Sequence, residues 1–449
     1  MPCFYIKTYG CQMNERDSEA LACLLEKRGL APASSEEDAD VIILNTCSVR
    51  DQAERKAIGK AGLLKRRKAV KPELVIGIIG CMAQNRGESL LEALPHIDFI
   101  AGTDRLAAVP DLVEQAQAGQ RLVDLARDTG PTPPEANGHQ PGNICAMVSV
   151  MRGCDQFCSY CIVPYTRGRE HSRSIPDIVA EATRLVEAGT KEILLLGQNI
   201  TAYGLAEIRR RDKQRPPSDQ SPFADLLEAL NDVPGLARIR FTSPHVSFMN
   251  DRFIDAVCQL PKVCKAFHIP LQSGSDRILS MMRRSYTATE YRDRIAAIRS
   301  RLPEVAFSTD VIVGFPTETD EDFRQTRELM AEVAFDMAYI FRYSPRTGTK
   351  AAEKFPDDVP EEIKHERNQA LLNDLEQAAI VRNRSFQGRV LEVLVEGVSK
   401  RNPDRWTGRC DLNKTCNFAP TPGLEPGMLA PFRVLRTSAN SLFGEIVLP

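Results

Sequence analysis

Three cysteines within eight residues form the densest group of reactive side chains in this sequence. The run CDQFCSYC places thiols at Cys154, Cys158 and Cys161, with the spacing C-x3-C-x2-C. Three closely spaced thiolates can hold three irons of a cuboidal iron–sulfur cluster, which leaves the fourth iron open to a small molecule. A structural zinc site needs four closed ligands instead, usually in two pairs. We therefore expect an iron–sulfur cluster at this loop, with a zinc site as the alternative.

Three further cysteines stand in matching places in the first part of the chain. Cys11 follows FYIKTYG, Cys47 follows VIILNT and Cys81 follows LVIGIIG, so each comes just after an apolar stretch that is typical of a strand. The carboxyl ends of parallel strands meet at one crevice, where ligands bind in open α/β sheets. We expect these thiols to converge on a second cluster; the alternative for any one of them is a small buried core residue.

Composition sets limits on the class of protein. The chain has 449 residues, 43% hydrophobic and 26% charged, which is typical of a globular protein with several domains. Its 13 cysteines fit metal ligands and buried thiols better than a disulfide framework. No run approaches the roughly 18 apolar residues of a membrane helix, and the first residues lack a secretory pattern, so we expect a cytoplasmic protein without membrane contact.

The elements that must position these cysteines fall into an α/β chain of several domains. Residues 1–128 alternate short apolar strands with helix-like stretches, which predicts a doubly wound parallel sheet. Residues 129–142 are rich in Pro and Gly and form a predicted linker. Residues 143–380 hold six more strand and helix pairs, which predicts an open, partial (β/α)6 barrel. Its strands are expected at 144–151, 191–197, 236–242, 266–271, 305–313 and 337–343.

Two charged segments interrupt this middle region or follow it. Residues 208–220 include RRRDKQRPPSDQ and predict a surface loop, and residues 361–383 predict a long charged helix. The tail, 381–449, contains short strands separated by Gly, Pro and Asn, which predicts a small antiparallel β-barrel. From Arg382 onward it carries ten Lys and Arg against six Asp and Glu. This excess suits RNA binding or a plain capping domain; Trp406 could stack on a base or pack inside the barrel.

Polar motifs at the ends of the predicted barrel strands could hold a cofactor. S-adenosylmethionine can chelate the open iron of a cluster through its amino and carboxylate groups, while the protein orients it. Any single motif of this kind could equally be a polar turn. The candidate cofactor residues are Gly197 and Gln198, Thr242 and Ser243, Gln272 and Ser273, and Asp310, Gly314, Pro316 and Glu318.

With these motifs the chain resembles the radical S-adenosylmethionine methylthiotransferases. The barrel motifs are MRGCDQFCSYCIVPYTRGRE, LLGQN, TSPH, HIPLQSGSDRIL, DVIVGFPTETDEDF and YIFRYSPRTGT, and the first domain carries TYGCQMN, LNTCSVR and IIGCMAQ. The resemblance covers nearly the whole chain. It implies a radical SAM barrel and a TRAM-like RNA-binding tail. It also implies two [4Fe–4S] clusters, one on each cysteine triad, with the amino-terminal one as auxiliary cluster.

The resemblance also implies a reaction. Within the family, VPYTRGREHSRS and SKRNPDRWTGRCDLNKTCNF are similar to the branch of tRNA-2-methylthio-isopentenyladenosine synthases. These transfer a methylthio group to carbon 2 of isopentenyladenosine next to the anticodon, with S-adenosylmethionine as methyl donor and radical source. Expected partners are tRNA, an electron donor protein and a sulfur source. Tyr165, Arg167 and Arg169 are candidate contacts to RNA or cofactor; the alternative for the arginines is solvated surface.

Other functions stay open at this point. A methylthiotransferase could act on threonylcarbamoyladenosine in tRNA or on a ribosomal protein. A non-catalytic iron–sulfur protein that binds RNA would carry the same cysteines without cleaving S-adenosylmethionine. A zinc-dependent RNA-binding protein would contain no sulfide.

Overall fold

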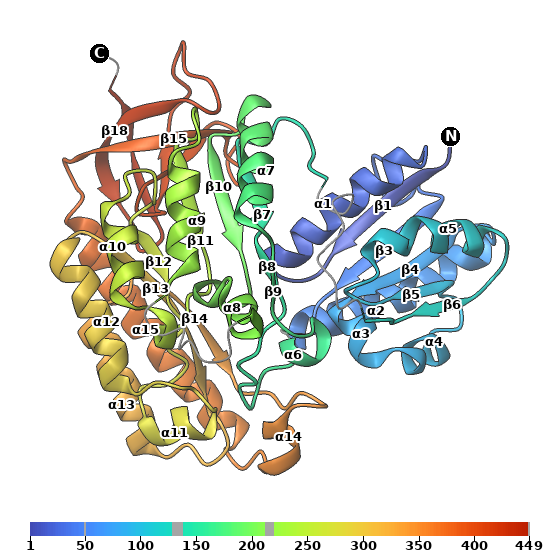
Figure 1. Cartoon of the computed structure of the whole chain (residues 1–449), viewed down its shortest axis with the longest axis horizontal. Helices are drawn as coiled ribbons and strands as arrows, with labels where there is room; N and C mark the ends of the chain where they lie inside the picture. The colour runs from blue at the N-terminus through green and yellow to red at the C-terminus, as the bar shows by residue number, and fades with distance from the viewer. Residues whose placement is uncertain (49–50, 128–137, 212–219, 448–449) are drawn as a thin grey trace.

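Three folded units follow one another along the chain (Figure 1). The structure is a computed structural model that describes residues 1–48, 51–127, 138–211 and 220–447. Most of the predicted linker 129–142 therefore lies outside the described residues. Among the residues that are described, no helix is long and apolar enough to cross a membrane.

The first unit is a parallel six-stranded sheet of order β2-β1-β3-β4-β5-β6. Helices α1 (Gln12–Lys27) and α5 (Val109–Gln117) pack their apolar faces on one side. Helices α2 (Asp51–Val70), α3 (Cys81–Arg86) and α4 (Glu88–Ala93) cover the other side, so the predicted doubly wound sheet is confirmed. The strands are β1 Cys3–Thr8, β2 Ala31–Pro32, β3 Val41–Thr46, β4 Val75–Gly80, β5 Phe99–Ala101 and β6 Leu122–Asp124.

The second unit is an open barrel of parallel strands with helices outside. Strands β7-β10-β11 form one sheet and β12-β13-β14 the other, and a parallel bridge between Ile239 and Val263 joins them. No pairing between β7 and β14 is found among the described residues, as the predicted partial (β/α)6 barrel requires. The strands are β7 Cys145–Ser149, β10 Glu192–Leu196, β11 Arg238–Phe241, β12 Ala266–His268, β13 Ala306–Val313 and β14 Met337–Arg342. The main outer helices are α7 Ile175–Glu187, α9 Pro222–Asn231, α10 Asp251–Gln259, α12 Ala288–Arg301, α13 Asp320–Val333 and α15 Glu361–Arg384.

The tail forms a closed five-stranded barrel of order β15-β16-β17-β19-β18. The small barrel is confirmed, but β17 and β19 pair in parallel, unlike the antiparallel pattern predicted. The short strand β17 was not predicted either. Its strands are β15 Val390–Val398, β16 Trp406–Cys410, β17 Thr415–Phe418, β18 Leu429–Thr437 and β19 Ser441–Ile446.

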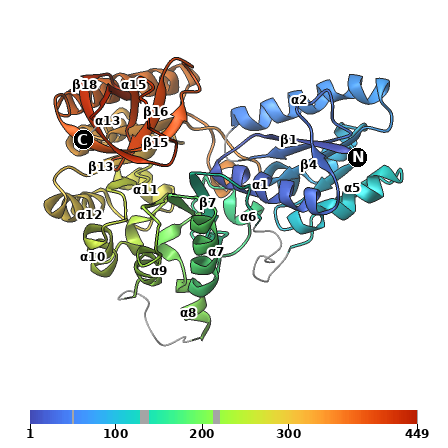
Figure 2. The same ribbon diagram turned by 90° about the horizontal axis from the view of Figure 1, so that it is seen from above.

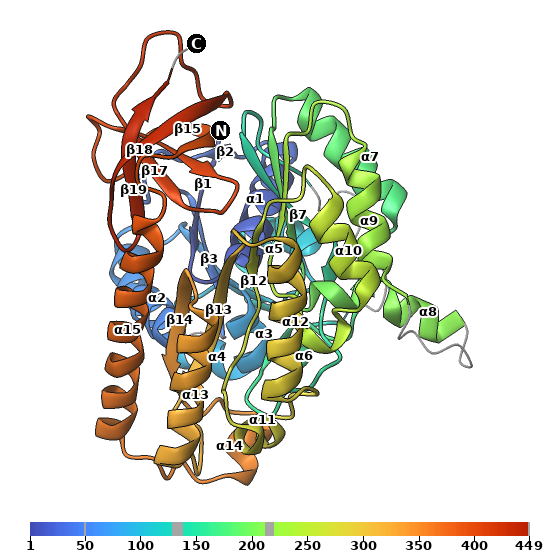
Figure 3. The same cartoon turned by 90° about the vertical axis from the view of Figure 1, so that its left-hand side faces the viewer.

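The tail barrel lies at the amino ends of the central strands. Arg240 of β11 donates hydrogen bonds to the carbonyl oxygens of Asp411 and Cys410 at 3.0 and 2.8 Å. Figure 3 shows the tail barrel at the top of the molecule and α14 (Lys350–Lys354) at the opposite, lower end. Figure 2 shows the tail barrel and the first unit on opposite sides of the molecule. The predicted surface loop 208–220 begins as helix α8 (Leu205–Arg211), and 212–219 lie outside the described residues.

Candidate functional site: two cysteine triads

The loop that carries Cys154, Cys158 and Cys161 is closed at its base by a two-stranded ribbon, β8 (Met151–Arg152) with β9 (His171–Ser172). Gly153 opens the loop with φ 75°, and a side chain there would come within 2.1 Å of the backbone oxygen of Arg169. Only glycine fits at such a position.

The end of α11 (Asp276–Met281) holds the middle of this loop in place. Ser159 donates its backbone N–H to the carbonyl of Met282 at 2.9 Å and its hydroxyl to the carbonyl of Met281 at 2.8 Å. The carbonyl of Ser159 accepts from the N–H of Ala351 at 2.7 Å. Residues beyond β12 and β14 therefore fix where the thiols lie.

Arg284 contacts one of the three sulfurs directly. Its Nη1 donates to Cys158 Sγ at 3.3 Å, and its Nε donates to the Tyr286 hydroxyl at 3.0 Å. The guanidinium also lies 4.9 Å from the centre of the Tyr286 ring. The tyrosine hydroxyl donates to the carbonyls of Pro270 and Leu271, just after β12. Sequence reasoning missed this arginine, although it stands in MMRRSY shortly after a recognised motif.

Burial raises the pKa of two thiols in this loop. It raises the pKa of Cys154, and burial together with the neighbouring Cys158 raises the pKa of Cys161 to about 12. The protein by itself therefore favours the neutral thiol form of Cys154 and Cys161. A bound metal must displace their protons, as expected for thiolate ligands.

Cys11 and Cys47 lie side by side at the carboxyl ends of β1 and β3. A hydrogen bond from Cys47 lowers the pKa of Cys11 to about 5, against the effect of burial. The space around them is tight: a side chain at Gly10 would come within 2.5 Å of Asn14 Oδ1 and 3.0 Å of Cys47 Cβ. Strands β1 and β3 are where the sheet order reverses, the usual ligand site of such sheets.

Cys81 links this group to the barrel loop. It begins α3 after Gly80, whose φ of 93° would bring a side chain within 2.5 Å of the Thr46 carbonyl oxygen. Helix α3 packs against α6 (Val163–Thr166), which follows the 154–161 loop, and Cys81 is close enough to Cys161 to raise its pKa. The structure thus brings the two predicted triads together.

Arg167 lies in the interior, whereas Arg169 is exposed. The Nη2 of Arg167 pairs with Asp17 of α1 at 2.8 Å, and its side chain is only 3% exposed. Burial would lower the pKa of Arg167, but Asp17, Cys81 and Cys11 outweigh it and raise that pKa. In this conformation Arg167 therefore meets the amino-terminal triad and not the solvent, where an RNA would bind.

The other candidate RNA contacts are more accessible. Arg169 pairs with Asp155 at 2.8 Å and lies 5.3 Å from the centre of the Phe157 ring. Tyr165 is half-buried, with its ring 6.0 Å from that of Phe157. Trp406 is half-buried against the core of the tail barrel.

The candidate cofactor residues after β10 lie beside the cysteine loop, and those after β11 are half-buried. Gln198 has a buried Oε1 and its neighbour Asn199 a buried Nδ2, neither with a hydrogen-bond partner in the described part of the chain. A side chain at Gly197 would come within 2.7 Å of Met151, beside the cysteine loop. Thr242 and Ser243 are half-buried, and Ser243 has φ 60°.

Asp310 and Gln272 lie on neighbouring strand ends. Asp310 pairs with His268 at 3.2 Å, and its carbonyl accepts from the backbone N–H of Gln272 at 2.8 Å. Gln272 has φ 69° and is buried. Pro316 is buried in the turn that follows β13.

The polar groups of two candidate cofactor residues form hydrogen bonds with outer helices. Ser273 shares a hydrogen bond with Thr326 of α13 at 3.2 Å. Glu318 accepts from the Gly314 N–H at 2.7 Å and from Arg367 of α15 at 2.8 Å. Burial raises the pKa of Glu318 to about 6 despite these donors. Both side chains anchor helices to the barrel here.

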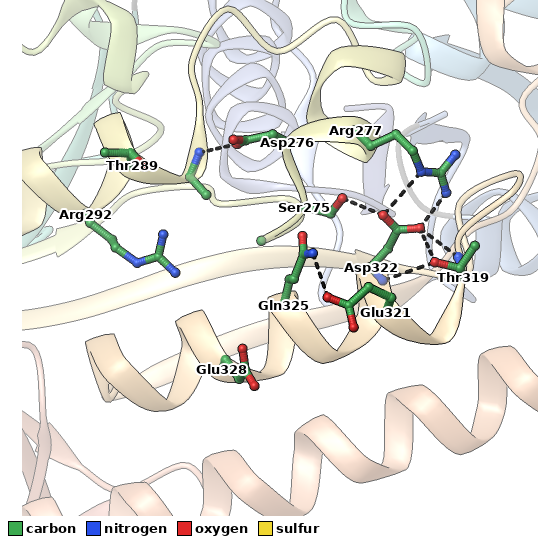
Figure 4. A pocket seen from close by; sticks show the side chains of 12 residues that line it. Ser275, Asp276, Arg277, Thr289, Arg292, Thr319, Glu321, Asp322, Gln325 and Glu328 are labelled. Atoms are coloured by element: carbon green, nitrogen blue, oxygen red, sulfur yellow. Dashed lines mark hydrogen bonds and ion pairs between the residues drawn. The ribbon is translucent and has the colours of Figure 1, made fainter.

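A pocket of about 520 Å³ lies between α11, α12 and α13. Figure 4 shows the side chains that line it. Asp322 lies at its centre and accepts from Ser275 Oγ at 2.6 Å and Thr319 Oγ1 at 2.6 Å. Arg277 completes the group with an ion pair of 2.5 Å to Asp322. All of these groups are already paired with one another.

The donor set suits iron–sulfur clusters. In the described residues, no group of three His, Cys, Asp or Glu is placed to hold a single metal ion, as zinc would require. Thiolates on separate irons of a cuboid stand further apart. The Arg167 Nη1 and the hydroxyl of Ser48, next to Cys47, are buried without partners in the described chain. Such donors fit the sulfurs of a bound cluster.

Comparisons with known proteins match each unit. Residues 3–102 match the uncharacterized protein family UPF0004, 148–330 the radical SAM superfamily and 384–447 the TRAM domain. Among solved structures, the radical S-adenosylmethionine methyltransferase TsrM from Kitasatospora setae superimposes with a TM-score of 0.54 at 13% identity, over 76% of this chain and 73% of that one. At that identity the match shows the fold alone.

Sequence relatives cover the whole chain. The tRNA-2-methylthio-N(6)-dimethylallyladenosine synthase of Opitutus terrae is 47% identical, over 99% of this chain and 97% of its own length. The synthase of the same name from Akkermansia muciniphila is 42% identical, over 99% and 98%. Together with the three domain matches, these relatives show that the chain belongs to the radical SAM family of tRNA-2-methylthio-N(6)-dimethylallyladenosine synthases.

Proposed function

We propose that this chain transfers a methylthio group to carbon 2 of N(6)-dimethylallyladenosine (isopentenyladenosine) next to the anticodon of tRNA. The observation that carries this proposal is the meeting of the two cysteine triads where α3 packs against α6. A transfer between two cluster sites needs them adjacent. The family relatives that act on tRNA and the TRAM domain match support the substrate.

We assign the cofactors to the residues as follows. Cys154, Cys158 and Cys161 hold a [4Fe–4S] cluster that binds S-adenosylmethionine, and Cys11, Cys47 and Cys81 hold an auxiliary [4Fe–4S] cluster. When bound, these groups supply methyl transfer, electron transfer and radical chemistry. The remaining cofactor contacts proposed are Gly197, Gln198, Thr242, Ser243, Gln272, Asp310, Gly314 and Pro316, while Ser273 and Glu318 act by anchoring their loops.

The chain's own groups prepare the site for that chemistry. At the end of β10, Gln198 Oε1 and Asn199 Nδ2 are buried without partners in the described part of the chain, so they could bind a polar ligand. Arg284 donates to Cys158 Sγ and helps to fix the position of this side chain. Helix α3 packs on α6, and Met82 and Ala83 of α3 and Pro164 and Thr166 of α6 are buried.

We also propose the partners of the chain and the boundaries of its domains. The reaction consumes electrons and sulfur, so an electron donor protein and a sulfur source must serve it. RNA contacts are assigned to Tyr165, Arg169 and the tail with Trp406, in the cytoplasm, where tRNA is found. We place the domains at 1–128, 143–380 and 381–449, with 129–142 as linker.

The test uses anaerobically reconstituted protein, a reductant, a sulfide source and tRNA with or without the dimethylallyl group. Cys158→Ala should abolish 5′-deoxyadenosine formation. Cys47→Ala should retain it but stop methylthiolation of the tRNA. The matched control Cys3→Ala removes a thiol outside both triads and should behave like the parent.

Mass spectrometry of the digested tRNA identifies the product. Iron and sulfide analysis should give about eight of each per chain. Methylthiolation by Cys47→Ala at the parent rate would contradict the auxiliary site. A methylthio group found on threonylcarbamoyladenosine or on a ribosomal protein would show that the substrate is a different one. Zinc without sulfide would refute the iron–sulfur clusters.

A further inference from the structure

Arg167 reaches the amino-terminal triad from a different domain. It follows α6, which packs against α3, the helix that begins at Cys81. Its guanidinium pairs with Asp17 of α1, the helix that Cys11 caps. Asp17 is 150 residues away in sequence. The docking of the two units therefore places a buried cation from one beside the thiols of the other.

The two ends of this guanidinium have different surroundings. Nη2 pairs with Asp17 at 2.8 Å, whereas Nη1 is buried and has no hydrogen-bond partner among the described residues. A buried donor left without an acceptor destabilises the folded protein, because it has lost its hydrogen bonds to water. Such groups in a folded protein call for a ligand or another explanation. Here the neighbouring thiols of Cys11 and Cys81 indicate what the ligand is.

We propose that Arg167 completes the auxiliary site by donating its free N–H to a sulfur of the cluster held by Cys11, Cys47 and Cys81, and that it thereby raises the reduction potential of this cluster. The inference rests on the proposed function for the presence of that cluster. It makes Arg167 a positioning and tuning residue, and it explains why this arginine is buried.

The direction of the effect follows from charge. Adding an electron makes a cluster with thiolate ligands more negative, so a nearby cation stabilises the reduced form more than the oxidised form. Hydrogen bonds to cluster sulfurs act in the same direction. Asp17 offsets part of this charge, since it lies on the other end of the same guanidinium. Removal of Arg167 should lower the potential, and removal of Asp17 alone should raise it.

The test measures the auxiliary cluster alone in the full chain. A parent with Cys154, Cys158 and Cys161 all changed to Ala retains only the amino-terminal triad. In this parent, Arg167→Gln combined with Asp17→Asn gives a neutral pair of nearly unchanged shape. We expect the iron and sulfide content to be unchanged. The midpoint potential should become more negative by about 59 mV, which corresponds to a tenfold change in the ratio of oxidised to reduced cluster for one electron. Potentials are read by EPR during anaerobic redox titration.

Two further variants keep the result decisive. Asp17→Asn alone should shift the potential upward; it decides the matter if the double variant assembles no cluster. Arg169→Gln removes an exposed arginine two residues away and should leave the potential unchanged. An unchanged potential in both Asp17 variants, or an equal shift in Arg169→Gln, overturns the proposal.

The measurement needs neither tRNA nor turnover. If the triple-alanine parent binds a cluster but the wild-type chain does not modify tRNA, the proposed function is refuted. The effect of Arg167 on the cluster has then still been tested. A parent that binds no cluster would refute both.

Discussion

Arg284 and Arg167 each bring a positive charge to one cysteine triad. Arg284 donates to Cys158 at 3.3 Å, and Arg167 lies beside Cys11 and Cys81. Both come from segments outside the cysteine runs. Hydrogen bonds and charges of this kind orient metal ligands and tune the metal, so they belong to the site as much as the thiols do.

Removal of Arg284 should impair the barrel cluster specifically. Arg284→Met takes away the donor to Cys158 and its positive charge, so the reduced cluster becomes less stable. We expect about tenfold slower 5′-deoxyadenosine formation without tRNA, with a more negative midpoint potential. Such a loss corresponds to about 1.4 kcal/mol.

A matched variant separates charge from packing. Tyr286→Phe retains the ring beside Arg284 but removes the hydroxyl that accepts from its Nε. It should slow the reaction less than Arg284→Met does. Equal rates for parent and Arg284→Met, at equal iron content, would show that Arg284 only fills space.

Sequence spacing predicted the six thiols but not their partners. The Cys154–Cys161 run is local, so its ligand pattern is visible in the sequence. Arg284 is 126 residues from Cys158, and Arg167 is 150 residues from Asp17. Only the folded chain brings such pairs together. For the same reason, a polar residue such as Ser273 at a strand end could not be assigned to the cofactor side or the helix side.

At the scale of elements, the strand ends also anchor the outer helices. Glu318 ties the turn after β13 to Arg367 of α15, and Asp322 ties the start of α13 to Ser275 and Arg277. The strands and main helices were predictable because their apolar periodicity is strong. Strand β17 is too short for such a pattern.

Asp322 should make stability depend on acid pH. Burial opposes its charge, but Arg277, Ser275 and Thr319 outweigh burial and lower the pKa of Asp322 below its ordinary 3.8. A carboxyl with a lowered folded pKa stabilises the fold above its unfolded pKa and loses this effect as pH falls toward the folded one.

Asp322→Asn should therefore cost about 2 kcal/mol at pH 7 and clearly less near pH 3. Urea denaturation at both pH values measures the difference. Glu328→Gln, on the rim of the same pocket, is the control and should show little effect at either pH. A cost that is equal at pH 7 and pH 3 would contradict this role of the charge.

At the scale of the whole molecule, a buried polar group fastens the amino-terminal unit to the barrel. His139 lies 2.7 Å from Glu181 of α7 and 3.4 Å from Glu19 of α1. Arg16 donates to the carbonyl of Gly138 at 2.7 Å. Burial would lower the pKa of His139, but its bonds to Glu181 and Glu19 raise that pKa above 6.5.

The contact between the amino-terminal unit and the barrel should therefore become weaker at alkaline pH. A histidine whose folded pKa is raised stabilises the fold fully below its unfolded pKa, and this stabilisation is lost as pH rises through the folded pKa. His139→Gln should cost about 2 kcal/mol at pH 6 and less at pH 9, as measured by urea denaturation. His365→Gln, at an exposed site on α15, should leave both values unchanged. A larger cost at pH 9 than at pH 6 would contradict the charged pairing.

The tail barrel acts at a distance from the cysteine sites, because it lies at the amino ends of the central strands. It cannot simply be deleted as a test, since Arg240 is buried beneath it and would lose the carbonyls of Asp411 and Cys410. Charge can be removed without that damage. Lys400, Arg401 and Arg405 are exposed beside β16.

Neutralising this patch should weaken tRNA binding without unfolding the protein. Lys400→Gln, Arg401→Gln and Arg405→Gln together remove three cations from a tail whose net charge is positive. Each lost phosphate contact should reduce the slope of log Kd against log salt by about 0.7–0.9. Filter binding or fluorescence anisotropy at several salt concentrations measures the slope, with Arg324→Gln on the exposed side of α13 as control. An unchanged slope, with affinity equal to that of the control, would make the tail a structural cap, and the RNA contacts would then lie on the barrel near Arg169.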